Sequence, residues 1–151
     1  MDQSMMAAIG QFGAAAVLGL SAAGSALGAG TAGMAAIGAW KKCYAQNKTA
    51  PFILVTFIGA PMSQTIYGFI LMNKMIELLS TGNVANFGLM LGAGLLGGLG
   101  IGASAWFQGK AGAAGADAMA ETNQGFGNYL MTLGVIETVA LLVMVFTLIK
   151  L

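Results

Sequence analysis

Residues 133–146 read LGVIETVALLVMVF. This run is apolar except for one carboxylate, Glu137, and it belongs to a longer apolar segment that could cross a lipid bilayer. A charged side chain at that depth costs several kcal/mol by order of magnitude, so such residues are rare and mark ion or substrate pathways. The stretch therefore predicts a transmembrane helix that presents Glu137 to an ion.

The composition indicates an integral membrane protein. The chain has 151 residues, of which 58% are hydrophobic and only 7% are charged, and its mean hydropathy is +0.83. A soluble domain needs far more charge on its surface. The net charge of +1 provides no basic surface for nucleic acid. The start of the chain lacks the basic residues of a signal peptide, so we expect the first apolar segment to be retained. The single Cys43 excludes an internal disulfide, and we expect it to be a free thiol in a loop.

Four apolar segments follow one another, and each meets the requirement of about 20 residues for a spanning helix. They are approximately Met5–Ala39, Pro51–Met75, Phe87–Ala116 and Phe126–Ile149, with polar breaks at 41–48, 77–86 and 121–124. The segments are continuously apolar rather than alternating, which argues against a transmembrane β-barrel. We predict an all-α membrane protein whose four transmembrane helices form two tandem hairpins, residues 1–78 and residues 79–151.

The lysines predict the orientation of these helices. Lys41, Lys42 and Lys48 cluster in the first polar break, and the positive-inside rule places that break in the cytoplasm. The third break is then cytoplasmic too, whereas both termini and the second break face outward.

The first and third segments are rich in glycine and alanine. Gly94, Gly98 and Gly102 recur every four residues, so they lie on one helix face, where small residues let helices approach closely in lipid. A dimerising helix pair is the usual meaning of this motif. Here glycine and alanine cover nearly the whole circumference of both helices, which favours the tight inner wall of a ring. Both hairpins pair such a helix with a bulkier one, and both point the same way, so we predict a parallel duplication rather than an inverted repeat.

The second and third segments supply further polar groups within the membrane. Pro61 has no N–H, so the helix should kink there and leave carbonyl oxygens under-bonded. The positions three, four and seven residues after Ala60 share its face, and they hold polar side chains. These are Ser63, Gln64 and Tyr67, and the third segment adds Gln108.

Depth in the membrane can be compared within each hairpin, because residues equidistant from the turn lie at equal depth. By this measure Gln108 is level with Glu137, and Ser25 is level with Gln64. Gln64 and Glu137 therefore occupy matching positions in the two hairpins, one neutral and one acidic. This predicts one site assembled from several helices, with one ion per chain.

The expected site offers a carboxylate, two amide oxygens, a hydroxyl and a backbone carbonyl near Ala60. Hard cations prefer such ligands, and a single negative charge balances a monovalent ion better than a divalent one. The chain has no histidine and one cysteine, so a zinc or copper site has almost no support. A proton would need only Glu137 in its neutral form. The additional oxygens favour sodium.

Each neutral member of this set also has a structural interpretation. Gln64 and Gln108 could be interhelical hydrogen-bond partners, and the Ser63 hydroxyl could bond to its own helix. Tyr67 could pack or donate to the carboxylate, and Pro61 could simply bend its helix.

The other charges near the third segment have ordinary explanations. Lys110 lies nearer the cytoplasm and can snorkel toward the membrane surface, so we do not pair it with Glu137. Asp117 and Glu121 look like charges at the end of a loop.

The whole chain resembles the duplicated proteolipid of V-type and bacterial V/A-type rotary ATPases, also called the K or c protein of their rotor. Its sodium-binding version is matched by Pro61-Met62-Ser63-Gln64 with Tyr67, by Gln108-Gly109-Lys110 and by Glu137-Thr138. The resemblance implies that Na+ is held by Glu137, Gln108, Gln64, Ser63 and the backbone carbonyl of Ala60. It also implies that Tyr67 bonds the carboxylate and that Pro61 and Thr138 support the site.

The resemblance further implies a homo-oligomeric rotor ring in the bacterial plasma membrane, with the glycine-rich helices inside. A stator subunit of the a/I type would load and unload each site with the help of a stator arginine. A central-stalk subunit of the d/C type would couple the ring to ATP hydrolysis in a soluble head. The chain itself is expected to be non-catalytic, because its glycines lie in membrane helices without a Walker sequence. The alternatives are a proton rotor that uses Glu137 alone, a small secondary transporter or channel, and a purely structural pore-forming proteolipid.

Overall fold

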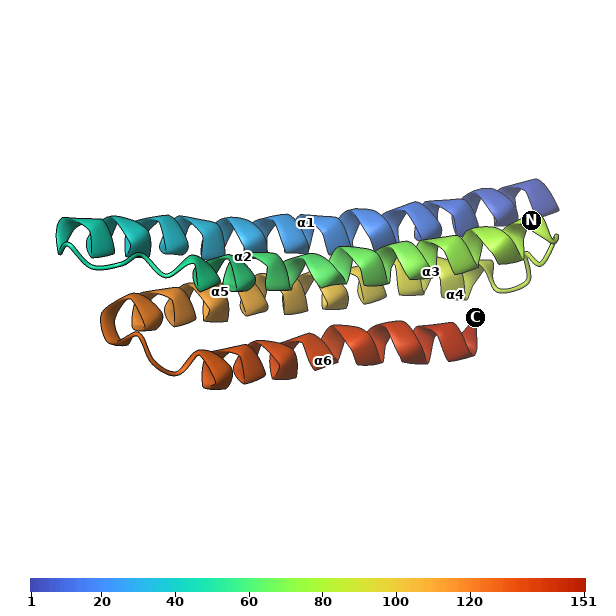
Figure 1. Cartoon of the computed structure of the whole chain (residues 1–151). Helices are drawn as coiled ribbons and strands as arrows, with labels where there is room; N and C mark the ends of the chain where they lie inside the picture. The colour runs from blue at the N-terminus through green and yellow to red at the C-terminus, as the bar shows by residue number, and fades with distance from the viewer.

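Four continuous helical stretches make up the computed structural model, which describes all of residues 1–151 (Figure 1). They are Gln3–Ala45, Phe52–Ser80, Phe87–Thr122 and Phe126–Lys150. Each is long and apolar enough to cross a membrane by length and composition. The prediction of an all-α chain with four candidate membrane spans is confirmed, and the helices extend beyond the apolar segments by a few residues.

The elements within these stretches reflect local interruptions of the α-helix. In chain order they are α1 (Gln3–Ala45), the 3-10 turn η1 (Phe52–Leu54), α2 (Val55–Gly59), the 3-10 turn η2 (Ala60–Met62), α3 (Ser63–Ser80), α4 (Phe87–Gly92), the π-helical turn η3 (Ala93–Gly97), α5 (Gly98–Thr122) and α6 (Phe126–Lys150). The turn between α5 and α6 is tight because Asn123 and Gly125 both adopt left-handed backbone conformations, with φ of 51° and 84°.

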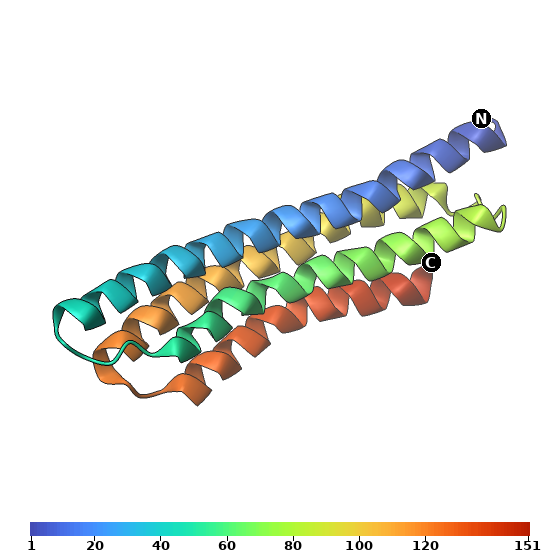
Figure 2. The same cartoon turned by 45° about the horizontal axis from the view of Figure 1, so that its top comes forward.

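The helices run side by side as a bundle of two hairpins. α1 packs along α5 and α3, and α6 packs against the same two helices, so α1 and α6 lie on opposite sides of the bundle. Figure 2 shows both chain ends at one end of the bundle and the turns after α1 and α5 at the other. The two hairpins therefore point in the same direction.

α1 and α5 approach each other backbone to backbone. A Cβ atom on Gly24 would lie 2.1 Å from the carbonyl oxygen of Gly102, and one on Gly109 would lie 2.1 Å from the carbonyl oxygen of Gly28. Real Cβ atoms do not come that close to any atom. The predicted small-residue face is confirmed from Gly94 of η3 to Gly102 of α5, and it packs against α1. Only glycine allows this separation.

The first polar break is shorter than predicted. α1 continues to Ala45, so Cys43 lies inside the helix and only 2% of it is exposed. The expectation of a thiol in a loop is wrong. The reason is that the last turns of α1 pack on the last turns of α5, where Cys43 Sγ lies 3.9 Å from the carbonyl oxygen of Ala120 and Lys42 pairs with Glu121.

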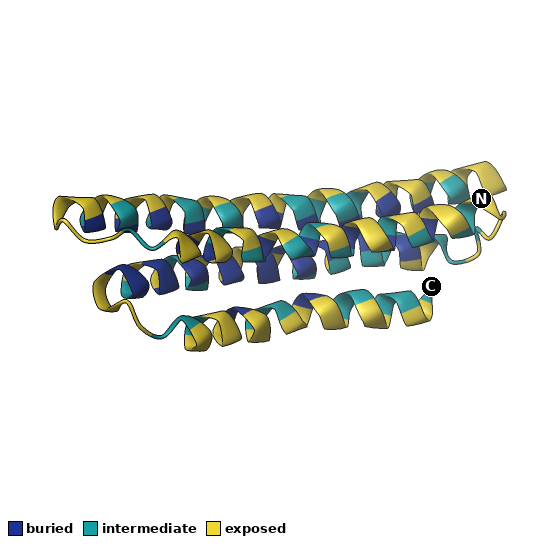
Figure 3. Ribbon diagram, viewed as in Figure 1, coloured by how far each residue is buried: buried dark blue, intermediate teal, exposed yellow.

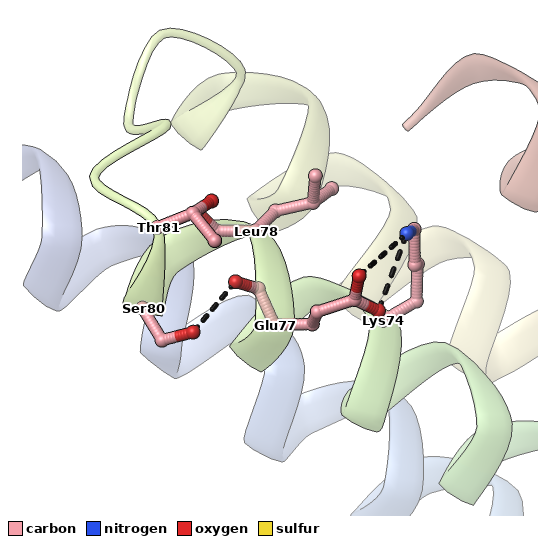
Figure 4. A network of polar contacts seen from close by, with 5 residues as sticks. All are labelled: Lys74, Glu77, Leu78, Ser80 and Thr81. Carbon is pink, nitrogen blue, oxygen red and sulfur yellow. Dashed lines mark hydrogen bonds and ion pairs between the residues drawn. The ribbon is translucent and has the colours of Figure 1, made fainter.

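The charged pairs of the bundle lie toward the ends of the helices. Figure 4 shows Lys74 Nζ of α3 donating to both carboxylate oxygens of Glu77, each at 3.2 Å, beside the Ser80 hydroxyl that donates to the Glu77 carbonyl. The other ion pair joins Lys42 to Glu121 at the opposite end of the bundle. Exposed pairs of this kind contribute little to stability. Neither of them involves Glu137.

Burial differs between the helices. In α6 only Leu133 and Ala140 are buried, and Figure 3 shows most of this helix as exposed or half-buried. Gly24 and Gly28 of α1 and Gly102 and Gly109 of α5 are buried where these two helices face each other. The helix that carries Glu137 is thus the least enclosed of the four spans.

Candidate cation-binding site

Glu137 lies half-buried on α6, where it is bonded from two other helices. The Tyr67 hydroxyl of α3 donates to Oε1 at 2.5 Å, and the Gln108 amide of α5 donates to Oε2 at 3.1 Å. Hydrogen bonds to a carboxylate are stronger than those between neutral groups. Each carboxylate oxygen is therefore held by a donor from a different helix.

Gln108 connects the parts of this network. Its side chain is fully buried, and Nε2 also donates to the carbonyl oxygen of Leu133 on α6 at 3.1 Å. Its Oε1 accepts a hydrogen bond of 2.7 Å from Nε2 of Gln64, which is fully buried as well. Buried amides are costly unless they are bonded. These two satisfy each other and extend the network from α3 through α5 to α6.

Pro61 shapes the α3 side of the site. Because proline lacks an N–H, the α-helix gives way to the turn η2 at Ala60–Met62. The Ala60 carbonyl is not under-bonded, contrary to expectation: it accepts the backbone N–H of Ser63 and lies 3.1 Å from Ser63 Oγ. The same Oγ lies 3.1 Å from Oε1 of Gln64. A hydroxyl has one proton, so Ser63 donates to one of these oxygens at a time and keeps its lone pairs for other partners.

The gathered groups can bind a hard cation chemically. They combine a carboxylate with amide, hydroxyl and backbone carbonyl oxygens, which are ligands of such ions. Gln108 can present Oε1 to a cation while its Nε2 holds Glu137, because both atoms belong to one amide. A partly buried carboxylate without a cationic partner is unfavourable, and a bound cation or a proton would offset that cost.

Lys110 does not supply the missing positive charge. It is exposed on α5, and its Nζ lies 4.2 Å from the ring centre of Trp106 and 5.2 Å from that of Phe107. This geometry is that of a cation–π contact. Lys110 and Glu137 are therefore engaged with different neighbours.

Most of the sequence-predicted site residues meet in the network: Glu137, Gln108, Gln64, Ser63, Ala60 and Tyr67. Thr138 does not, because it is exposed and its hydroxyl donates to the Gly134 carbonyl of its own helix at 2.9 Å. Sequence reasoning missed Ser104, whose buried hydroxyl donates to the Ile136 carbonyl at 2.9 Å. The available signal was its position four residues before Gln108, on the same face of α5.

The second hairpin is similar to a known protein family. Residues 91–150 match the family model that describes the C subunit of ATP synthase. The matched range runs from the end of α4 to the end of α6 and includes both Gln108 and Glu137. No curated protein matches the chain. Residues 91–150, somewhat less than half of the chain, are therefore similar to the C subunit of ATP synthase.

Proposed function

We propose that the chain is a rotor-ring protomer of a V-type rotary ATPase and carries one sodium ion across the membrane. The family match supports the rotor assignment, because it covers the hairpin that holds Glu137. The four candidate spans, twice as many as the matched range contains, support a duplicated protomer. In this role the chain is non-catalytic, and ATP hydrolysis takes place in the soluble head.

The proposed repeat units are residues 1–78 and 79–151. The turn between α3 and α4 follows Ser80, close to this boundary. In the first unit Gln64 takes the place that Glu137 has in the second, and the two are joined through Gln108. Because Gln64 is neutral, one protomer would carry one monovalent ion rather than two.

The observation that carries the sodium assignment is the surplus of oxygens around a carboxylate that has no cationic partner. A proton would occupy one oxygen of Glu137 and would need none of the others. Hydrogen bonds link Gln64 and Gln108 to that carboxylate. The Ser63 hydroxyl lies 3.1 Å from both Gln64 Oε1 and the Ala60 carbonyl oxygen. This donor set suits sodium better than a proton.

Sodium as cargo would neutralise Glu137, so the loaded site would move past lipid at a lower cost than a free charge. Tyr67 and Gln108 would hold the carboxylate in place when sodium leaves, which keeps the site organised for the next ion. The partners of this cycle are further copies of the chain in a ring, a stator subunit of the a/I type with its arginine, and a central-stalk subunit of the d/C type.

The proposed orientation follows from the lysines and the shape of the bundle. Lys41 and Lys42 lie near the end of α1 and Lys48 lies in the turn that follows. This end of the bundle holds both hairpin turns (Figure 2). We place this end in the cytoplasm of a bacterial cell and both termini outside the plasma membrane. The central stalk would then meet the turns after α1 and α5.

The function is tested by carbodiimide labelling of Glu137 in the isolated ring. The carboxyl group gives its proton to the carbodiimide and its oxygen then adds to the reagent, so a cation bound at Glu137 in place of the proton should slow the reaction. We expect sodium to slow labelling in a saturable manner at near-neutral pH, and potassium at the same concentration to have much less effect. Failure of sodium to slow the labelling would contradict the sodium assignment and favour a proton as cargo.

Replacing Gln64 by leucine separates the two cargoes. Leucine has a similar size but no oxygen, so sodium loses one ligand while Glu137 keeps both donors, Tyr67 and Gln108. We expect the sodium concentration for half-maximal protection to rise at least about tenfold, which corresponds to one lost polar contact with a charge. The pH dependence of labelling without sodium should change much less.

Gln11→Leu is the matched control for this substitution. Gln11 is exposed on α1 and does not belong to the hydrogen-bond network of Glu137. The sodium concentration that gives half-maximal protection, here called the sodium midpoint, should therefore be the same in Gln11→Leu as in the wild type. An unchanged midpoint in Gln64→Leu would show that Gln64 is an interhelical hydrogen-bond partner rather than a ligand.

A further inference from the structure

The helix that carries Glu137 is the least buried of the four spans. Leu133 and Ala140 are its only buried residues. Three side chains from other helices donate hydrogen bonds to α6: Tyr67, Gln108 and Ser104. These bonds add to the packing of apolar side chains of α6, such as Tyr129 and Val143, in holding the helix on α3 and α5.

Ser104 is bonded to the backbone directly beside the carboxylate residue. Its hydroxyl donates to the carbonyl oxygen of Ile136 at 2.9 Å, and only 6% of Ser104 is exposed. The Ile136 carbonyl and the Glu137 nitrogen belong to the same planar peptide unit. Fixing this oxygen therefore fixes the backbone from which the Glu137 side chain departs. The carbonyl can accept this bond and an intrahelical one because it has two lone pairs.

Ser104 differs from the other two donors in what it touches. Tyr67 bonds the carboxylate itself, and Gln108 bonds both the carboxylate and Gln64. Their bonds must therefore adjust when an ion binds or leaves. The bond of Ser104 involves neither the carboxylate nor any of the proposed ligand oxygens. It can stay in place through the whole cycle.

We propose that Ser104 is a positioning residue, which holds the Ile136–Glu137 peptide against α5 so that the carboxylate stays in register with Gln108. This inference rests on the proposed sodium function. It adds that the affinity of the site depends on a hydroxyl that does not contact the ion.

The hydroxyl is tested with the matched pair Ser104→Thr and Ser104→Val, which add similar bulk and differ in the donor. We expect the threonine variant to be protected from carbodiimide at nearly the wild-type sodium concentration. The valine variant should need about five- to tenfold more sodium, the effect of one buried hydrogen bond. Ser104→Ala adds no bulk, so it tests the hydroxyl even if the Ser104→Val variant does not assemble into a ring. It should need as much sodium as Ser104→Val.

Ser21→Ala provides the control for loss of a buried hydroxyl. Ser21 is fully buried, but its hydroxyl donates at 2.7 Å to the Val17 carbonyl of its own helix. We expect its sodium midpoint to equal that of the wild type.

Equal sodium midpoints in the threonine and valine variants would overturn the positioning role, because any lost affinity would then come from bulk. A wild-type midpoint in Ser104→Ala would overturn it too, even if the ring were less heat-stable, because that is the result of a merely structural bond. Failure of the sodium function itself gives a different result: sodium would not protect the wild-type ring at all.

Discussion

Replacing Glu137 by glutamine is expected to abolish ion transport by the assembled ATPase. Glutamine keeps the size of the side chain and removes its charge, so the remaining neutral oxygens would have to hold a cation alone. Removing one member of a buried charge pair costs about 3–5 kcal/mol, so sodium affinity should fall by at least about 100-fold. The measurements are ATP-driven sodium uptake into vesicles and carbodiimide labelling, which should disappear from the chain.

Glu121→Gln is the matched control for Glu137→Gln. Glu121 is a carboxylate at the end of α5, where it pairs with Lys42 on the outside of the bundle. Its replacement should leave sodium transport and the labelling of Glu137 unchanged. Normal transport in Glu137→Gln would contradict both the sodium and the proton rotor and favour a structural proteolipid.

Much of the fold could be predicted because membrane helices follow a simple rule. Every backbone polar group must be bonded within the hydrocarbon region, so long apolar segments form helices. The glycine face from Gly94 to Gly102 was predictable for the same kind of reason, since small residues repeated every four positions fit only a close neighbour. The structure identifies that neighbour as α1 of the same chain.

The end of α1 could not be predicted from apolarity. The lysines at 41 and 42 look like a loop, but they lie in the last turns of α1, which pack on the last turns of α5. Cys43 is buried because Met119 and Ala120 of α5 cover it. Polar sequence at a helix end marks where lipid stops, and it does not mark where the helix stops.

The members of the site could be predicted because few polar residues lie inside the apolar segments. Their hydrogen bonds could not be predicted, because the partners of a donor depend on where individual atoms lie, and the spacing of residues in the sequence does not give those positions. The Ala60 carbonyl was expected to be free, yet Ser63 donates to it. Thr138 lies next to Glu137 in sequence and points elsewhere, since adjacent helical residues do not share a face.

A single methyl group at position 109 is expected to destabilise the bundle. The Cβ of Gly109→Ala would lie 2.1 Å from the Gly28 carbonyl oxygen and 2.3 Å from the Gly28 Cα, both of them backbone atoms. No change of rotamer relieves such a contact, so α1 and α5 must separate. Overpacking typically costs about 1–3 kcal/mol, and we expect the upper part of that range, measured as a lower dissociation temperature of the detergent-solubilised ring.

Gly38→Ala is the matched control, because it changes the helix propensity in the same way as Gly109→Ala but creates no contact with another helix. Gly38 is exposed on α1, and a Cβ there meets nothing within 4 Å. Alanine favours a helix over glycine by about 1 kcal/mol, so this variant should be as stable as the wild type or slightly more stable. If Gly109→Ala were as stable as the wild type, the close approach of α1 and α5 would be contradicted.

Because Gly109 follows Gln108 on α5, the separation of α1 and α5 should also move the Gln108 amide. This should weaken the protection of Glu137 by sodium, whereas Gly38→Ala should leave that protection unchanged.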